Sequence, residues 1–191
     1  KYLKEHYDLD DDRVAILDVY EETSVQEGEP EDVLAYTDEV INYLKSHSIT
    51  DKSTYDYIKT KIDVENFIDY NVAEIFFGNT DWPGNNVSIW KYKTEDGEYD
   101  PDADYGLDGR WRWFLKDTDF GFGLYGKSVS HNTLAFAAGD TQEGYANAPW
   151  SVFLFKTLLQ NPDFRNEFIN RFADQLNTSF VSSRVNEVID D

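Results

Sequence analysis

The sequence predicts an α+β domain that is mainly helical and carries one small antiparallel β-hairpin. Apolar residues recur at helical spacing through several stretches, and strand-like alternation is strongest in two short stretches on either side of an acidic excursion. Of the 191 residues, 40% are hydrophobic, which is enough for a buried core. No internal repeat, low-complexity tract or linker divides the chain, so we expect a single domain over residues 1–191.

The charge restricts the partners of this chain. With 38 acidic and 17 basic residues, the net charge is −21. Such a charge argues against nucleic acid and anionic membrane surfaces and favours basic partners or bound cations, although solubility alone would also account for it. The sequence has no Cys, its three His are isolated, and no apolar run approaches the ~20 residues of a membrane span. We therefore expect no thiolate or zinc site and no transmembrane segment.

The first third of the chain is expected to hold a strand and two helices. Residues 13–19 form an apolar run typical of a strand, and residues 21–29 are interpreted as polar loop. Apolar residues at helical spacing follow Pro30, which suits a first helical position, and this helix is expected over residues 30–46. A short second helix would be capped by Asp51 or by Ser53.

The clearest predicted helix follows Asp63, a favourable N-cap residue, and ends at Gly78, which suits the position after a helix. An inward stripe at spacings of three and four is formed by Val64, Phe67, Ile68, Asn71, Val72, Ile75 and Phe76. A buried helix is a rigid support, so the residues that follow it are well placed for catalysis.

Residues 87–93 and 110–116 are the two predicted strands of the hairpin. Trp111 and Trp113 share one face of the second strand, and continued alternation would place Asp117 and Asp119 on that face as well. Two carboxylates in this relation repel each other unless a cation lies between them. Residues 128–145 are expected to be irregular, and three helices are expected in the remainder of the chain, after Pro149, after Pro162 and from Phe180.

Two loops carry the polar residues with the most informative spacing. Asp81 and Asn86 lie five residues apart in Gly-Asn-Thr-Asp-Trp-Pro-Gly-Asn-Asn, residues 78–86. In protein kinases an Asp accepts the proton of the substrate hydroxyl, and an Asn five residues later holds a metal ion. By itself the segment is more readily interpreted as a surface turn, because Asp, Pro and Gly are turn formers.

The second loop is expected to supply a metal carboxylate. Asp119 begins a literal Asp-Phe-Gly, the tripeptide of protein kinases, whereas Asp117 directly follows the predicted strand. We favour Asp117 as the principal ligand and Asp119 as a second ligand or an orienting group. Neither loop is specific alone. The second loop follows the first with a predicted hairpin between them, and this order makes the pair of loops informative.

These segments resemble the CotH kinase family. The resemblance rests on residues 62–70, 78–86, 111–121, 158–165 and 168–172. It implies a protein-kinase-like C-terminal lobe that transfers the ATP γ-phosphoryl group to Ser residues of protein partners, often basic coat proteins. It also implies Asp81 as the base, Asn86 with Asp117 as ligands of Mg²⁺ or Mn²⁺, assistance from Asp119, and an extracellular, cell-surface or spore-coat setting.

One departure from a complete kinase concerns the nucleotide. Gly28 is the only glycine before Gly78, so no glycine-rich phosphate loop is visible, and Leu17 stands where a Val-Ala-Ile-Lys strand would have its Lys. The chain also begins at Lys1. We therefore expect the C-terminal part of a kinase domain, with the nucleotide lobe absent or incomplete, and no activity from this piece alone.

Two other functions are considered. Asp100, Asp102, Asp104, Gly106 and Asp108 imitate a calcium loop, although Tyr105 stands where that loop needs Gly. Together with the many aromatic residues, this pattern favours a calcium- or glycan-binding surface module. Alternatively, Asp81 and Asp117 would be the carboxylate pair of a glycoside hydrolase, in which the adjacent Asn residues have no necessary part.

Overall fold

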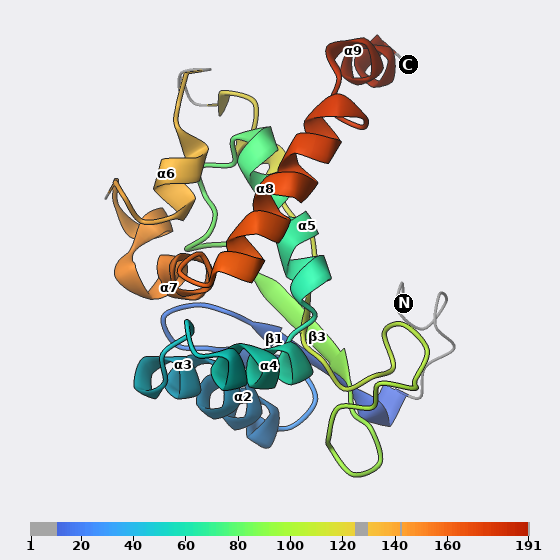
Figure 1. Ribbon diagram of the computed structural model, residues 1–191. Helices are drawn as coiled ribbons and strands as arrows, with labels where there is room; N and C mark the ends of the chain where they lie inside the picture. Colours follow the sequence, from blue (N-terminus) through green and yellow to red (C-terminus); the bar gives the residue numbers. More distant parts are fainter. Residues whose placement is uncertain (1–10, 125–129, 142, 191) are drawn as a thin grey trace.

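A computed structural model of the chain describes residues 11–124, 130–141 and 143–190 (Figure 1). Its helices are α2 (Pro30–Tyr36), α3 (Tyr43–Ser46), α4 (Lys52–Lys61), α5 (Val64–Phe77), α6 (Thr133–Ala137), α7 (Pro149–Leu158), α8 (Pro162–Asn177) and α9 (Ser182–Asp190). Its strands are β1 (Val14–Asp18), β2 (Ser24–Glu27), β3 (Ser88–Tyr92) and β4 (Arg112–Trp113). The predicted mainly helical α+β fold with antiparallel pairing is confirmed.

The sheet is larger than the predicted hairpin. Its four strands lie in the order β2-β1-β3-β4, all antiparallel, so the hairpin of β3 and β4 forms one edge and extends through β1 to β2. The interpretation of residues 21–29 as loop was wrong. β2 is an edge strand whose side chains are mostly exposed, so it lacks the apolar alternation by which a half-buried strand is recognised.

The predicted second strand, residues 110–116, is also shorter in the structure. β4 ends at Trp113, and Leu115 is 52% exposed although Trp111 and Trp113 are buried. The alternation therefore stops before it reaches the two carboxylates. Asp117 has a left-handed backbone, with φ 51°, and Asp119 lies in a single 3-10 turn, η3 (Thr118–Phe120). The expectation that both lie on the face of the Trp residues was wrong.

Helices form where the periodicity predicted them. α2 begins at Pro30 and continues without a break through a π-helical segment, η2 (Thr37–Asn42), into α3. Asp51 occupies the cap position before α4. Within residues 130–141, part of the stretch expected to be irregular, α6 forms a short helix, because the Asn132 side chain caps it by accepting from the Ala135 N–H. Residues 128, 129 and 142 lie outside the described residues.

α5 is the central helix. Asp63 Oδ1 accepts from the Asn66 N–H at 3.1 Å, and Gly78, with φ 68°, ends the helix in the left-handed conformation that glycine adopts without strain. The predicted stripe is buried except at its last member, Phe76, which is half-buried and stacks on Phe180 with ring centroids 3.8 Å apart.

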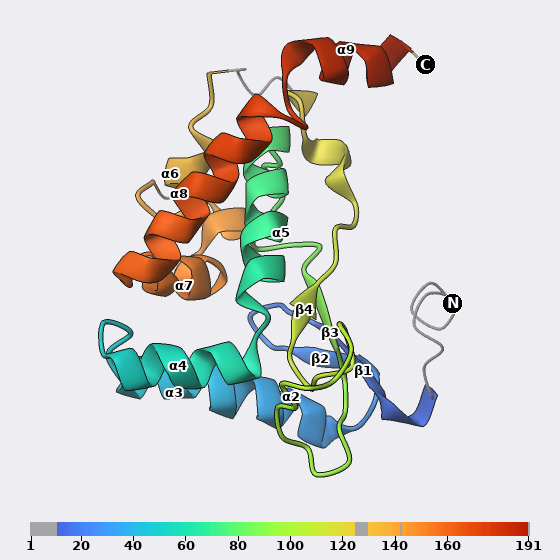
Figure 2. The same ribbon diagram turned by 45° about the vertical axis from the view of Figure 1, so that its right-hand side comes forward.

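The later helices cover α5, and α8 lies across it (Figures 1 and 2). Asn161 fixes the start of α8: its Oδ1 accepts from the Asp163 and Phe164 N–H groups, and its Nδ2 donates to Ile49 O. α9 projects from the body of the molecule and has no buried residue. No helix in the described part of the chain is both long and apolar enough to cross a membrane.

Candidate active site

The first loop leaves the C-terminal end of α5 and is fixed by a chain of hydrogen bonds that begins inside that helix. Glu74, 1% exposed, accepts from Asn79 Nδ2 at 2.8 Å. The Asn79 Oδ1 in turn accepts from the backbone N–H of Asp81 at 3.1 Å. Because Glu74 and Asn79 are both buried, the backbone of Asp81 is held by the core rather than by the surface.

The carboxylate of Asp81 is held from its other side by two amides. Asn85 Nδ2 and Asn86 Nδ2 donate to Asp81 Oδ2 at 2.7 Å and 3.1 Å. Both amides donate to the same oxygen, Oδ2. The other oxygen of Asp81, Oδ1, is left free by the described side chains. Asp81 and Asn86, which the sequence singles out by their spacing, are therefore joined by a direct hydrogen bond within the loop.

Burial raises the pKa of Glu74 to about 7, although the hydrogen bond from Asn79 opposes the shift. Glu74 is thus a carboxyl group that changes its charge near neutral pH, directly behind the Asp81 loop. It was not predicted as a site residue. A signal was present, because Glu74 lies three residues after Asn71 and seven after Phe67, on the edge of the inward stripe.

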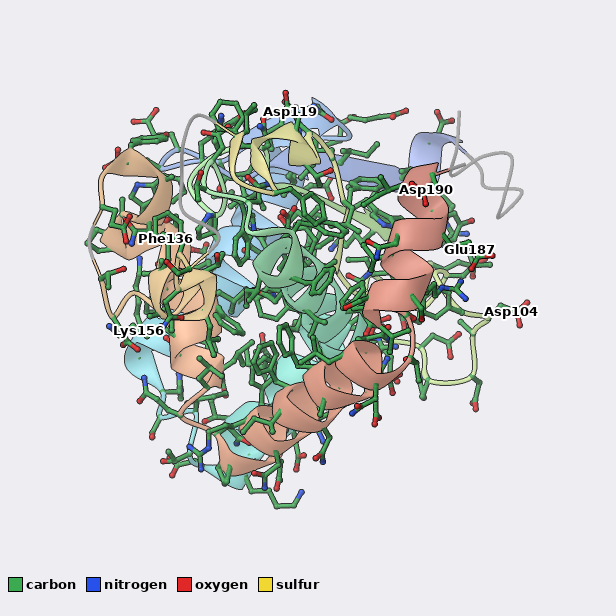
Figure 3. The ribbon with its side chains drawn as sticks, turned by 90° about the horizontal axis from the view of Figure 1, so that it is seen from above. Asp104, Asp119, Phe136, Lys156, Glu187 and Asp190 are labelled. Atoms are coloured by element: carbon green, nitrogen blue, oxygen red, sulfur yellow. The ribbon has the colours of Figure 1, made fainter. Side chains whose placement is uncertain are left out.

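The second loop carries Asp117 and Asp119 on the surface, where Figure 3 shows Asp119 at the rim of the molecule. A hydrogen bond with Asp117 raises the pKa of Asp119, and partial desolvation and the negative charge of Asp117 raise it further. Asp119 therefore holds its proton more readily than an isolated carboxyl group does, because another carboxyl group lies beside it. A cation between them would relieve the same repulsion.

Lys116, the residue before Asp117, is held by the sheet. Its Nζ lies 3.0 Å from Asp18 Oδ1 at the end of β1 and 2.6 Å from Ser88 Oγ at the start of β3. Although desolvation opposes it, the hydrogen bonds from Ser88 and Lys116 lower the pKa of Asp18. Lys116 and Asp18 were not predicted, because three residues so far apart in the chain meet only through the strand order.

Both loops are attached to the same end of α5. The Phe122 N–H donates to Phe77 O at 2.6 Å, and a Cβ on Gly121 would lie 2.9 Å from that oxygen, so only glycine allows this approach. Phe77 is the last residue of α5, and Gly78 begins the first loop. Figure 2 shows the segment after β4 rising beside α5 to the end of the helix.

The contacts within each loop are direct, whereas those between the loops run through α5 and β3. Asn85 and Asn86 each donate a hydrogen bond to Asp81, and Asp117 bonds to Asp119. Within the described ranges, no hydrogen bond or ion pair joins the Asp81 carboxylate to the other two carboxylates.

The backbone of the two loops is strained. Asn86, Asp117 and Phe122, with φ of 56°, 51° and 54°, are the only non-glycine residues with positive φ in the part of the chain that the structure describes. Asn and Asp tolerate this conformation better than other residues, and such strain is concentrated at functional sites. All three lie in the two loops that the sequence singled out.

The donor set fits a hard divalent cation. Asn86 offers an amide oxygen and the two Asp residues offer carboxylates, the ligands that Mg²⁺ and Mn²⁺ take. Among the described residues, no three His, Cys, Asp or Glu side chains form a metal-binding group. These three side chains would supply only part of the six-oxygen coordination of Mg²⁺, which takes its other ligands in nucleotide sites from water and phosphate oxygens.

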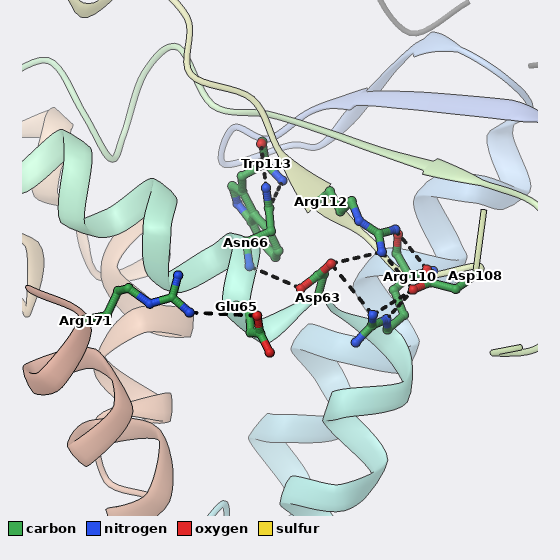
Figure 4. Close-up of polar contacts among 8 residues, drawn as sticks. All are labelled: Asp63, Glu65, Asn66, Asp108, Arg110, Arg112, Trp113 and Arg171. Carbon is green, nitrogen blue, oxygen red and sulfur yellow. Dashed lines mark hydrogen bonds and ion pairs between the residues drawn. The ribbon is translucent and has the colours of Figure 1, made fainter. Parts of the chain in front are cut away.

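The acidic excursion does not form the calcium loop that its spacing imitates. Asp108 is buried and binds Arg112 Nη1 and Nη2 at 2.9 Å and 2.8 Å, and Arg110 Nη2 at 2.7 Å (Figure 4). Asp100, Asp102 and Asp104 are exposed. Asp108 is therefore an internal ion-pair partner, and the remaining three carboxylates lack the fourth member of the pattern.

Comparison with known families decides the relationship. The family model described as CotH kinase protein matches residues 5–191. The chain belongs to the CotH kinase family. Membership supports a kinase-like function in general, with ATP, a divalent metal and a protein substrate as its general requirements. Neither a curated protein nor a solved structure matches the chain.

Proposed function

We propose that this chain is the C-terminal lobe of a CotH kinase that transfers the γ-phosphoryl group of ATP to Ser hydroxyls of basic proteins. The observation that supports the proposal most is that the only non-glycine residues with left-handed backbone in the described ranges lie in the two loops with kinase-like spacing. A setting at the cell surface or in a spore coat is part of the proposal, on the basis of the family.

Asp81 is proposed as the base. Its Oδ2 is engaged by Asn85 and Asn86, so Oδ1 is the atom that accepts the proton of the attacking hydroxyl. Asn79 holds the backbone of Asp81, and this fixes the direction of the carboxylate before substrate arrives.

Asn86, Asp117 and Asp119 are proposed to hold Mg²⁺ or Mn²⁺ with ATP. Such an ion, when bound, neutralises charge that develops on the phosphate oxygens during transfer. The contribution of the chain is to bring two carboxylates and an amide to one end of α5, with Lys116 fixed between Asp18 and Ser88 beside them. Lys116 is thereby engaged by the sheet and does not cancel the negative charge of the loop.

The protein substrate is proposed to be basic. A net charge of −21 attracts Lys- and Arg-rich segments and repels acidic ones, and this attraction raises the rate of encounter. We also propose that the phosphate-binding loop and its Lys belong to sequence outside this chain, since residues 1–77 contain one glycine. The chain alone should then bind ATP weakly at best.

Transfer of radiolabelled phosphate from ATP to a basic Ser-containing protein tests the proposal in the full-length protein that carries this chain. Asp81→Asn is expected to lower the transfer rate by about 10²- to 10⁴-fold, the usual contribution of a general base. The matched control is Asp102→Asn, which removes an exposed carboxylate from the acidic excursion and should leave the rate unchanged. Equal rates for Asp81→Asn and the control would contradict the assignment of the base.

A further inference from the structure

The carboxyl group of Glu74 lies in the core, at a place where the end of α5 does not need it. The helix ends through its backbone, because the Glu74 carbonyl oxygen accepts from the N–H groups of Gly78 and Asn79. Any residue at this position offers that oxygen, and the left-handed turn itself is made by Gly78. The side chain of Glu74 is therefore not part of the helix cap.

The carboxyl group has one partner. Within the described part of the chain, its hydrogen bond is the one from Asn79 Nδ2 at 2.8 Å, and no Lys, Arg or His pairs with it. Glu74 is 1% exposed, and burial of a carboxylate with a single neutral donor is costly. The raised pKa of Glu74, about 7, expresses this cost. An apolar side chain of similar size would avoid the cost, so the carboxyl group does not serve the stability of the core.

The contact with Glu74 determines which way the side-chain amide of Asn79 faces. A primary amide donates from its nitrogen and accepts at its oxygen, and a carboxyl group offers an acceptor oxygen whether it is ionised or neutral. The Asn79 nitrogen therefore faces Glu74, and the Asn79 oxygen accepts from the Asp81 N–H at 3.1 Å. With the amide reversed, its nitrogen would face a second donor, the N–H of Asp81.

We propose that Glu74 is a positioning residue for the first loop, which fixes the backbone of Asp81 through Asn79 at a cost to the stability of the core. The inference rests on the proposed function, in which Asp81 is the base. Asp81 is then held at two points, its backbone by this relay and its carboxylate by the two amides of the loop. Proteins depart from the rules of stable packing chiefly where function requires it, and a costly carboxyl group whose one partner leads to Asp81 is such a departure.

Stability and phosphate transfer should respond differently to Glu74→Met in the full-length protein that carries this chain. The apolar side chain removes the buried carboxylate, so the urea midpoint at pH 8 should not fall. The Asn79 amide loses its acceptor, so kcat should fall about 10- to 100-fold, the usual effect of a misplaced catalytic group, while KM for ATP stays the same. Glu74→Gln keeps an acceptor oxygen, and its kcat should remain within about 3-fold of the unchanged protein.

Hydrogen–deuterium exchange read by mass spectrometry measures the hold on the loop without an assay of activity. In Glu74→Met, the peptide of residues 78–86 should exchange about 3- to 10-fold faster, the value of one buried hydrogen bond, and residues 64–70 of α5 should not change. Asn71→Leu is the matched control. Asn71 is equally buried on α5, but its side chain donates to Phe67 O within the helix, so loop exchange and kcat should stay as they are.

The two measurements separate this inference from the proposed function. No transfer by the unchanged protein would contradict the function, and faster loop exchange in Glu74→Met would still support the link from Glu74 to Asp81. If the unchanged protein transfers phosphate, an unchanged kcat in Glu74→Met would overturn the inference alone. A parallel loss of stability and kcat that Glu74→Gln does not rescue would show a structural role and would also overturn it. If Glu74→Met does not fold, Asn79→Ala breaks the same link and is judged by the same exchange and kcat.

Discussion

The two ends of α5 carry two groups of carboxylates whose charges are balanced differently. At the N-terminal end, Asp63 and Asp108 surround Arg112, with Arg110 as a second cation, and Arg112 is 0% exposed (Figure 4). At the C-terminal end, Asp81, Asp117 and Asp119 are partly or fully exposed, and their described partners are amides and each other. The same helix thus separates carboxylates neutralised by the protein from carboxylates that are not.

The difference shows which acidic residues are structural. Although burial opposes the shift, hydrogen bonds from Arg112 and Arg110 lower the pKa of Asp108, so it stays charged inside a paired network. At the other end, the pKa of Asp119 is raised by its carboxylate neighbour. A group of carboxylates that the protein leaves without a cation is a candidate for an external one, and this is the basis on which the second group is proposed as the metal site.

The largest expected effect on stability comes from the N-terminal group. Arg112→Met leaves two buried carboxylates with only Arg110, and it should lower the free energy of unfolding by about 3–5 kcal/mol in urea melts. Arg171→Met is the matched control. Arg171 pairs with Asp69 at the surface, so its loss should cost less than about 1 kcal/mol. Similar losses in the two variants would show that the buried network is not a structural centre.

The second effect concerns the pH dependence of the helix end. Glu74 titrates near 4.5 when unfolded and near 7 when folded, so the unfolded chain loses its proton first as pH rises. The free energy of unfolding therefore falls by about 3 kcal/mol between about pH 4.5 and pH 7. Each pH unit between the two pKa values contributes about 1.4 kcal/mol to this fall. Glu74→Gln removes this loss.

Urea melts of Glu74→Gln and of the unchanged chain at pH 4.5 and pH 8 measure the effect. The stability of the variant relative to the unchanged chain should rise by about 3 kcal/mol between the two pH values. Glu65→Gln, in the exposed first turn of the same helix, is the matched control. A flat difference for both variants would place Glu74 in an environment like that of a surface carboxyl.

The smallest effect concerns charge steering. In stopped-flow measurements at low salt, a basic Ser-containing peptide should associate faster than an acidic peptide of the same length, because the chain carries −21. At about 1 M salt, where the screening length falls to about 3 Å, the difference should vanish. Equal rates at low salt would show that the negative charge of the chain does not favour basic substrates.

The fold was predictable where one face of an element is buried, because apolar residues then recur at a regular spacing in the sequence. The stripe of α5, its Asp63 cap and its Gly78 end were all visible, because one face of that helix is buried along its length. β2 was missed because an exposed edge strand has no alternating apolar face, and α6 was missed because five residues are too few for a period. The end of β4 depends on pairing with β3, which local sequence does not specify.

The candidate site was predictable in its loop residues and not in their supports. Asp81, Asn86, Asp117 and Asp119 were chosen by spacing, and their roles remain predictions. Lys116 could not be assigned, since its partners Asp18 and Ser88 lie 98 and 28 positions away and are brought beside it by the sheet. Asp108 was considered as a member of a calcium loop, as an alternative, because spacing alone does not show that two Arg side chains engage it.

The most direct test of the difference between the two carboxylate groups is binding of Mn²⁺–ATP to the full-length protein. The electron paramagnetic resonance signal of free Mn²⁺ is the readout of this binding. Asp117→Asn should abolish saturable binding, because it removes a metal carboxylate. Asp81→Asn should bind as the unchanged protein does and yet fail to transfer phosphate, because only the base is lost. Full Mn²⁺–ATP binding by Asp117→Asn, with transfer intact in both variants, would contradict the assignment of the C-terminal carboxylates to catalysis.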